Sequence, residues 1–241
     1  MVLVAMLGAA PGQGRAAECR KLDFEGQGYA VCQAEVGQDL RLFLSGADGE
    51  ILGSFDRLGD VLAKEGRKLV FAMNAGMYHP NRQPVGLFVE QGSTVSRLVT
   101  RAGPGNFGML PNGVFCISED RFSVMESRRF ERESPDCLYA SQSGPMLVID
   151  NALHPKFLAG SASRRIRNGV GVTEDGRTAL FVMSDGAVNF FDFARVFRDA
   201  LHLPQALYFD GNISRLYAPE IGRDDFGFQM GPMVGLSQAA D

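Results

Sequence analysis

The chain has 241 residues, of which 45% are hydrophobic and 22% are charged, with a net charge of -4. These values are ordinary for a globular domain and exclude a disordered, collagenous or coiled-coil chain. An acidic balance argues against a nucleic-acid partner. No apolar run in the sequence reaches the roughly 20 residues that span a bilayer, so no membrane span is expected.

The first residues have the composition of a secretion signal. Residues 1–10 form a short apolar run, and residues 14–16 (Gly-Arg-Ala) fit the small-x-small pattern of a cleavage site. A basic segment before the apolar run is missing, so a buried apolar terminus is the alternative. We expect residues 1–17 to be a signal peptide and residues 18–241 to form the domain, which would be periplasmic or secreted.

The cysteines form an even set without C-x-x-C spacing: Cys19, Cys32, Cys116 and Cys137. This pattern favours two disulfides in an oxidising compartment over a zinc site. Proximity in sequence favours Cys19–Cys32 and Cys116–Cys137 among the three pairings that four cysteines allow. Four buried reduced thiols are the alternative.

Short apolar stretches alternate with turn signals along the chain. The patterns predict strands at 29–36, 40–45, 68–73, 85–90, 113–118, 121–126, 145–149, 179–184 and 206–209. We expect the first two to pair with each other. No linker, repeat or low-complexity run divides the chain.

Two helices stand out from the strands. One is expected at about 56–65. The other carries apolar residues at helical spacing from Phe193 to Leu201, with Asn189 as its cap and Pro204 beyond its end. The pattern as a whole predicts a mixed α/β (α+β) fold, with a single strand-rich domain and few helices.

Polar residues follow several apolar strands at the point where each strand ends. Asn74 follows 68–73, Asp150 follows 145–149, and Asp210 follows 206–209. Strand-end loops on a rigid sheet are where binding and catalytic residues usually lie. The alternative is ordinary turn chemistry, since Asn-Ala-Gly and Asp-Gly are common turn sequences.

An arginine cluster, Arg164, Arg165 and Arg167, precedes the glycine-rich segment 168–172. Arginine forks match phosphate oxygens, so in an acidic protein the cluster indicates a small anionic ligand. A solvated basic patch is the alternative. The G-x-G-x-x-G match at 103–108 opens no helix, so we expect a plain loop there. Three scattered histidines argue against a histidine-rich metal site.

Five short elements follow one another between residues 74 and 214: Asn74-Ala-Gly-Met-Tyr78, Pro84-Val-Gly-Leu87, Ser143-Gly-Pro-Met-Leu147, Arg167-Asn-Gly-Val-Gly171 and Asp210-Gly-Asn-Ile-Ser214. In this order they resemble the phosphodiester glycosidase family over roughly residues 65–218. One departure is Asn212, which stands where the family usually has a second glycine.

The resemblance implies an exported hydrolase that cleaves the sugar C1–O bond of a sugar-1-phosphodiester. Arg167, supported by Arg165, would stabilise the departing phosphate. Asp210, with Asp150 in reserve, would act at the anomeric carbon as nucleophile or base. The implied substrate-binding set is Asn74, Gly76, Tyr78, Ser143, Gly144, Asp150, Arg165, Gly171, Gly211, Asn212 and Ser214.

The implied partner is a small carbohydrate phosphate, such as part of a cell-envelope glycan. No cofactor is expected to be required, although the sequence leaves a divalent cation open and identifies no metal ligands. Two other classes remain. A non-catalytic exported carbohydrate-binding protein fits poorly with 5 Tyr and no Trp. A metal-dependent phosphodiesterase would need a denser set of Asp, His and Asn ligands.

Overall fold

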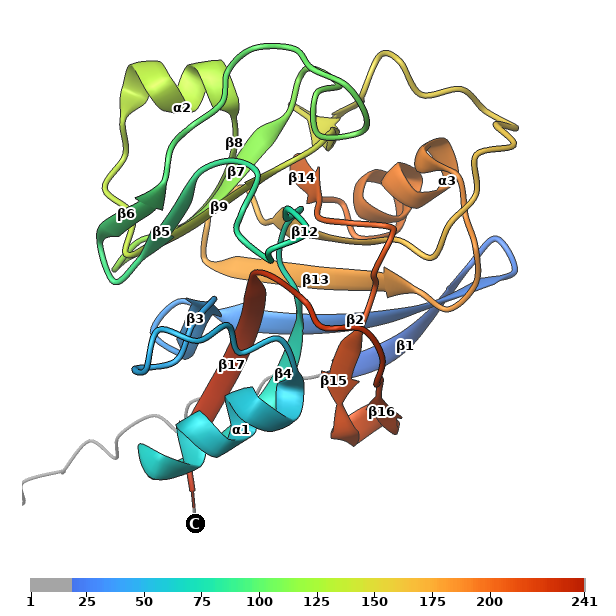
Figure 1. Ribbon diagram of the computed structural model, residues 1–241. Helices are drawn as coiled ribbons and strands as arrows, with labels where there is room; N and C mark the ends of the chain where they lie inside the picture. The colour runs from blue at the N-terminus through green and yellow to red at the C-terminus, as the bar shows by residue number, and fades with distance from the viewer. Residues whose placement is uncertain (1–18, 241) are drawn as a thin grey trace, which may run out of the picture.

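The computed structural model describes residues 19–240, which form three antiparallel sheets with a few short helices (Figure 1). This architecture confirms the predicted α+β class. The predicted signal peptide, residues 1–17, lies outside the described residues. Among the described helices, none has the length and apolar character needed to cross a membrane.

The largest sheet has seven strands and joins the first two strands of the chain to five strands from its second half. Its spatial order is β1 (Cys19–Phe24), β2 (Gln27–Glu35), β13 (Thr178–Ser184), β12 (Asn168–Val172), β14 (Gln205–Tyr208), β10 (Met146–Ile149) and β11 (Ala152–Leu153).

Each of the other two sheets has five strands. One runs β16 (Arg223–Asp224), β15 (Leu216–Ala218), β4 (Arg67–Asn74), β17 (Met233–Ala239) and β3 (Asp39–Phe43). The other runs β6 (Ser93–Ser96), β5 (Phe88–Glu90), β9 (Tyr139–Ser143), β7 (Gly113–Ile117) and β8 (Phe122–Glu126).

The expected pairing of the first two predicted strands is wrong. β2 pairs with β1 and β13, whereas β3 pairs with β17 in a different sheet. Both strands mix buried with partly exposed residues, and such a pattern does not specify which partner a strand takes. The partner of β3 comes from the far end of the chain.

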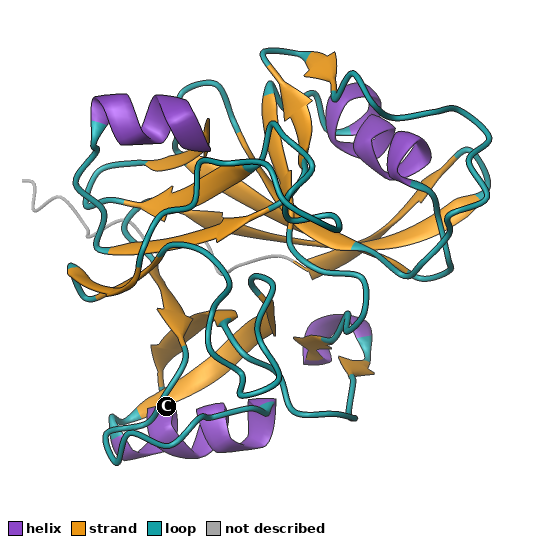
Figure 2. Cartoon of the chain, turned by 45° about the horizontal axis from the view of Figure 1, so that its top comes forward, coloured by secondary structure: helices purple, strands orange, loops and turns teal. Residues whose placement is uncertain are grey.

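The helices lie around the outside of the strands (Figure 2). They are α1 (Phe55–Lys64), α2 (Ser127–Glu133) and α3 (Phe190–Arg195), which continues as a π-helical turn (Val196–Ala200); a 3-10 turn follows later (Pro219–Ile221). Asn189 caps α3 as predicted, because its side chain accepts a hydrogen bond from the backbone N–H of Asp192 at 2.8 Å.

The three sheets share one buried core. Phe71 of β4, Phe115 of β7 and Phe181 of β13 are fully buried, and the ring of Phe181 lies 5.4 Å from that of Phe71 and 5.7 Å from that of Phe115. Each ring comes from a different sheet. Their contact therefore fixes the sheets relative to one another, and with them the strand ends that form the site.

Both predicted disulfides are present. Cys19 bonds to Cys32 across the β1–β2 pair, and Cys116 bonds to Cys137 with a Cα separation of 5.6 Å. Disulfides are typical of proteins that fold in an oxidising compartment.

Candidate functional site

Arg167 and Asp210 lie at the same edge of the seven-stranded sheet. Arg167 immediately precedes β12, and Asp210 follows β14 by two residues. The two strands are antiparallel neighbours, and the N–H of Phe209 donates to the carbonyl of Asn168 at 3.0 Å. The start of one strand therefore meets the end of the other, and both side chains line one cleft of about 620 Å³.

Arg167 is buried to 99%, with 1% of its surface exposed, and it is held by backbone and aromatic contacts. Its Nε donates to the carbonyl of Val188 at 2.9 Å, and its Nη2 donates to the carbonyl of Ser163 at 3.0 Å. The guanidinium carbon lies 3.6 Å from the centre of the Phe190 ring. These contacts fix the orientation of the guanidinium group but supply no negative charge.

The positive charge of Arg167 is uncompensated. Within residues 19–240 no carboxylate forms an ion pair with it, and Nη1 is buried without a hydrogen-bond partner. Burial lowers the pKa of this guanidinium, and the charge of Arg165 acts in the same direction. A buried, unpaired cation is costly unless a ligand supplies the counter-charge. The cleft is thus built to receive an anion.

Asp210 has 8% of its surface exposed and is oriented by the loop that follows it. Its Oδ1 accepts hydrogen bonds from the N–H groups of Gly211 and Asn212 at 2.6 and 3.0 Å. Burial raises the pKa of Asp210, and these backbone donors only partly oppose the rise. A carboxylate with a raised pKa is suited to proton transfer or to charge stabilisation in a cleft.

Behind the cleft, an amide network joins strand ends from two sheets. Asn168 donates through Nδ2 to Asn74 Oδ1 at 3.0 Å and to Ser214 Oγ at 2.9 Å. Asn74 Oδ1 also accepts from the N–H of Arg215 at 3.1 Å. Asn74 and Ser214 therefore lie behind the cleft as scaffold residues, and Asn168 belongs to the same network although its side chain was not predicted to take part.

Three further predicted residues support the walls of the cleft from behind. Ser143 donates through Oγ to the carbonyl of Phe209, the residue before Asp210, at 2.6 Å. A Cβ at Gly144 would lie 2.7 Å from the side chain of Asn112, and one at Gly76 would lie 2.7 Å from Ser141 Oγ. The small residues allow this close packing.

Four members of the predicted substrate-binding set, Tyr78, Arg165, Gly211 and Asn212, line the cleft itself. A Cβ at Gly211 would come within 1.9 Å of the Tyr208 hydroxyl, so only glycine fits there. The Tyr208 hydroxyl is buried and has no hydrogen-bond partner among residues 19–240. Tyr208 thus offers a hydroxyl beside Arg167 that a ligand oxygen could engage.

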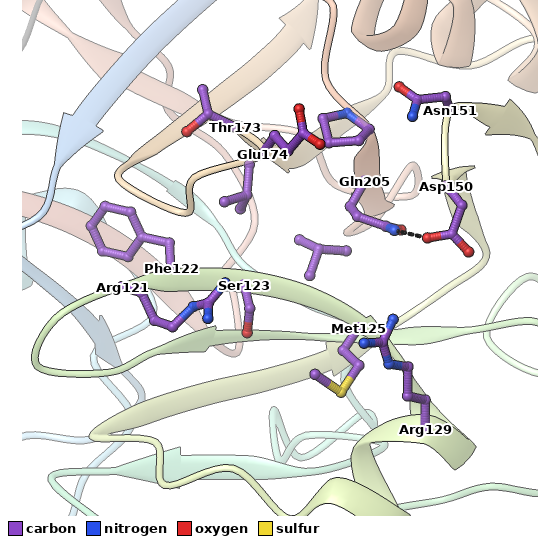
Figure 3. Close-up of a pocket in the computed structure, with 13 residues that line it drawn as sticks. Arg121, Phe122, Ser123, Met125, Arg129, Asp150, Asn151, Thr173, Glu174 and Gln205 are labelled. Atoms are coloured by element: carbon purple, nitrogen blue, oxygen red, sulfur yellow. Dashed lines mark hydrogen bonds between the residues drawn. The ribbon is translucent and has the colours of Figure 1, made fainter.

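Asp150 and Gly171 lie away from this cleft. Asp150 accepts a hydrogen bond from Gln205 in a separate hollow of about 310 Å³ (Figure 3). β10 and β14 are antiparallel, so Asp150 sits at the start of β14 and Asp210 beyond its end. Gly171 faces Phe197 and Leu203 instead, on the side that packs against the helix after β13.

Other residues line the cleft that the sequence analysis left out. The glycine-rich loop at 103–108 is a loop as predicted, and Gly105, Asn106 and Phe107 form part of the cleft wall. Arg82 also lines it and lies 5.3 Å from the Tyr78 ring. Within residues 19–240, no group of three His, Cys, Asp or Glu side chains is close enough together to hold a metal ion.

The sequence profile of the phosphodiester glycosidase family matches residues 67–225, and the chain belongs to this family. It is 35% identical over 178 residues to YigE, an uncharacterised Escherichia coli protein, covering 74% of this chain and 69% of that protein.

Two solved structures share the fold at 12% identity. The zebrafish N-acetylglucosamine-1-phosphodiester alpha-N-acetylglucosaminidase catalytic domain, auto-inhibited by its pro-peptide, matches with a TM-score of 0.62 over 94% of this chain and 85% of that one. A Burkholderia pseudomallei protein described as exported matches with a TM-score of 0.57, over 87% and 74%.

Proposed function

We propose that this protein is a hydrolase that cleaves the C1–O bond of a sugar-1-phosphodiester. The observation that carries the proposal is the buried, unpaired guanidinium of Arg167 in the same cleft as the carboxyl group of Asp210. Family membership and the name of the zebrafish structural relative support the same chemistry.

Arg167 is positioned for the leaving group. As the C1–O bond breaks, its electron pair goes to the oxygen, and the phosphate departs as a monoester with an additional negative charge. A preorganised cation in a site that excludes water stabilises that charge more than water would. Arg165, exposed at the mouth of the cleft, adds a second positive charge.

Asp210 is positioned for the sugar. The anomeric carbon gains positive charge as the bond breaks, and a carboxylate nearby stabilises it as a nucleophile or activates the incoming water. The water supplies the hydroxyl group that ends on C1, and its proton leaves through the carboxyl group or the phosphate. The hydroxyls of Tyr78 and Tyr208 and the amide of Asn212 would contact the substrate around this centre.

We place the mature protein in the periplasm or outside the cell. The two disulfides support this location, and so does the structural relative described as exported. A cell-envelope glycan is then an accessible source of sugar-1-phosphodiesters, and no cofactor is needed for the proposed reaction.

The test is a release assay on a panel of synthetic sugar-1-phosphate diesters, in which free sugar and phosphate monoester are both quantified. We expect equal amounts of the two products, with and without prior chelation. Sugar binding without release would favour the carbohydrate-binding class. Release that chelation abolishes would favour the metal-dependent phosphodiesterase.

A further inference from the structure

An apolar rim lies beside the proposed active site. It consists of Ile166, Phe226 and Phe228, with exposed fractions of 43%, 93% and 81%. The three side chains line a hollow of about 320 Å³, together with residues 211–215 of the catalytic loop. Large apolar side chains exposed together beside a cleft are characteristic of a binding surface.

The loop that carries both phenylalanines is anchored from within the protein. Arg215 has 8% of its surface exposed, and its guanidinium donates to the carbonyls of Asp225 at 2.6 Å and Phe228 at 3.1 Å. Gly227 between the two phenylalanines has a φ of 148°, a conformation that L side chains rarely adopt. The backbone is therefore held in a shape that directs both rings outward.

The apolar rim is continuous with the cleft. Gly211 and Ile213 line both the hollow and the cleft, and Arg165 of the cleft is adjacent to Ile166 of the rim. Tyr78, on the cleft wall, donates through its hydroxyl to the carbonyl of Gln229, one residue beyond Phe228, at 3.2 Å. A molecule with its phosphate at Arg167 can extend directly over the rim.

The mouth of the cleft is basic although the protein is acidic overall. Arg82 and Arg165 line it, and neither forms an ion pair with another residue among 19–240. The nearby Asp225 is paired with Arg223 at 2.6 Å, so it does not neutralise them. Basic side chains next to exposed aromatic ones are the combination that binds an anionic lipid surface.

We propose that the apolar rim docks on an anionic lipid surface and that the substrate is a lipid-linked sugar phosphodiester. Its sugar and phosphate would enter the cleft while its long apolar alcohol leaves over Phe226 and Phe228. This inference rests on the proposed function and names the class of group on the far side of the phosphate.

The first arm of the test measures docking alone. Vesicles of phosphatidylglycerol and phosphatidylcholine in equal amounts are sedimented with the wild type, with Phe226→Ser/Phe228→Ser and with Val95→Ser/Leu138→Ser. Val95 and Leu138 are also exposed, at 48% and 41%, but lie in another sheet and its flank. We expect rim substitution to weaken binding about tenfold or more, from the loss of two buried rings, with the control unchanged.

The second arm measures kcat/KM for two diesters of the same sugar-1-phosphate, one methyl and one decyl. We expect the decyl ester to be preferred about tenfold or more, as apolar burial predicts, and the preference to fall in the rim variant. Circular dichroism and thermal melting show that each variant is folded.

The two arms separate the possible failures. Equal kcat/KM for both esters would contradict the proposal of a lipid-linked substrate but would not contradict the proposed hydrolase activity. Release of sugar from neither ester would instead contradict the proposed function. Equal vesicle binding by the rim and control variants would overturn the docking surface.

Discussion

The guanidinium carbon of Arg167 lies 3.6 Å from the centre of the Phe190 ring, and Phe190 in turn stacks on Phe157 at 5.0 Å. The stack continues to His154, whose ring lies 4.7 Å from that of Phe157. The charge that we assign to phosphate recognition is thus supported by aromatic faces, which attract a cation without neutralising it.

Arg167→Ala should lower kcat and kcat/KM together, with a smaller change in KM, because the guanidinium acts mainly on charge that develops in the transition state. We expect a loss of about 10²–10³-fold, as for removal of one preorganised electrostatic donor. Arg167→Lys should recover only part of the activity, since a point charge does not reproduce the fork. Steady-state kinetics measures both, with Arg129→Ala in the hollow of Figure 3 as control.

We expect Phe190 to act as a positioning residue for Arg167, whose guanidinium lies over its ring. Phe190→Leu should keep the fold and lower kcat about tenfold, which corresponds to a desolvated cation–π contact, while Phe190→Tyr should restore most of the activity. The matched control is Phe193→Leu on the same helix, which stacks on Tyr29 and not on Arg167. Equal losses in both leucine variants would indicate a packing role only.

Asp210→Asn should abolish most of the turnover and raise the melting temperature at pH 7. Burial raises the pKa of Asp210 in the fold, so folding favours the protonated form and disfavours the carboxylate. The stability that this group contributes is present below the unfolded pKa of about 3.9 and is lost as the pH rises through the higher folded pKa. The difference in melting temperature should therefore disappear at low pH.

The control for that variant is Asp150→Asn, which changes a carboxylate in the separate hollow. It should leave sugar release unchanged. Loss of turnover in Asp150→Asn with normal turnover in Asp210→Asn would move the carboxylate role to the other hollow.

We expect His154 to make the fold sensitive to acid. Burial lowers the pKa of its imidazole from 6.5 to about 4, and the charge of Lys156 adds to the effect. A folded pKa below the unfolded one means that the stability is complete above about pH 6.5 and is lost as the pH falls toward 4, by up to about 3 kcal/mol. The free energy of unfolding, measured with denaturant across this pH range, should fall as the pH falls in the wild type and not in His154→Gln. The variant His202→Gln, at an exposed position, should show the same fall as the wild type.

The sequence allowed the fold class, the two disulfides and the α3 cap to be predicted because each depends on local pattern or on spacing. Asn189 precedes a run of apolar residues at helical spacing. Each disulfide joins two cysteines that are neighbours in the order of cysteines along the chain. The partner of each strand was harder to predict from the sequence. The partner of β3 is β17, almost 200 residues away, and no local signal identifies it.

The same limit explains the predicted site. Arg167, Asp210 and Tyr78 share a cleft because antiparallel neighbours bring the start of one strand to the end of the next. Because β10 and β14 are also antiparallel, Asp150 at the end of β10 lies beside the start of β14, at the opposite edge of the sheet from Asp210. Phe190 and Asn168 were missed because an aromatic at a helix start and an asparagine beside an arginine have many ordinary explanations.

The most direct test of the account is to run the hydrolysis in water labelled with the heavy oxygen isotope and to locate the label by mass spectrometry. If Arg167 stabilises a departing phosphate and Asp210 acts at the anomeric carbon, the label will appear in the released sugar and not in the phosphate monoester. Label in the phosphate monoester would show that the P–O bond is broken, and would contradict the assignment of both residues.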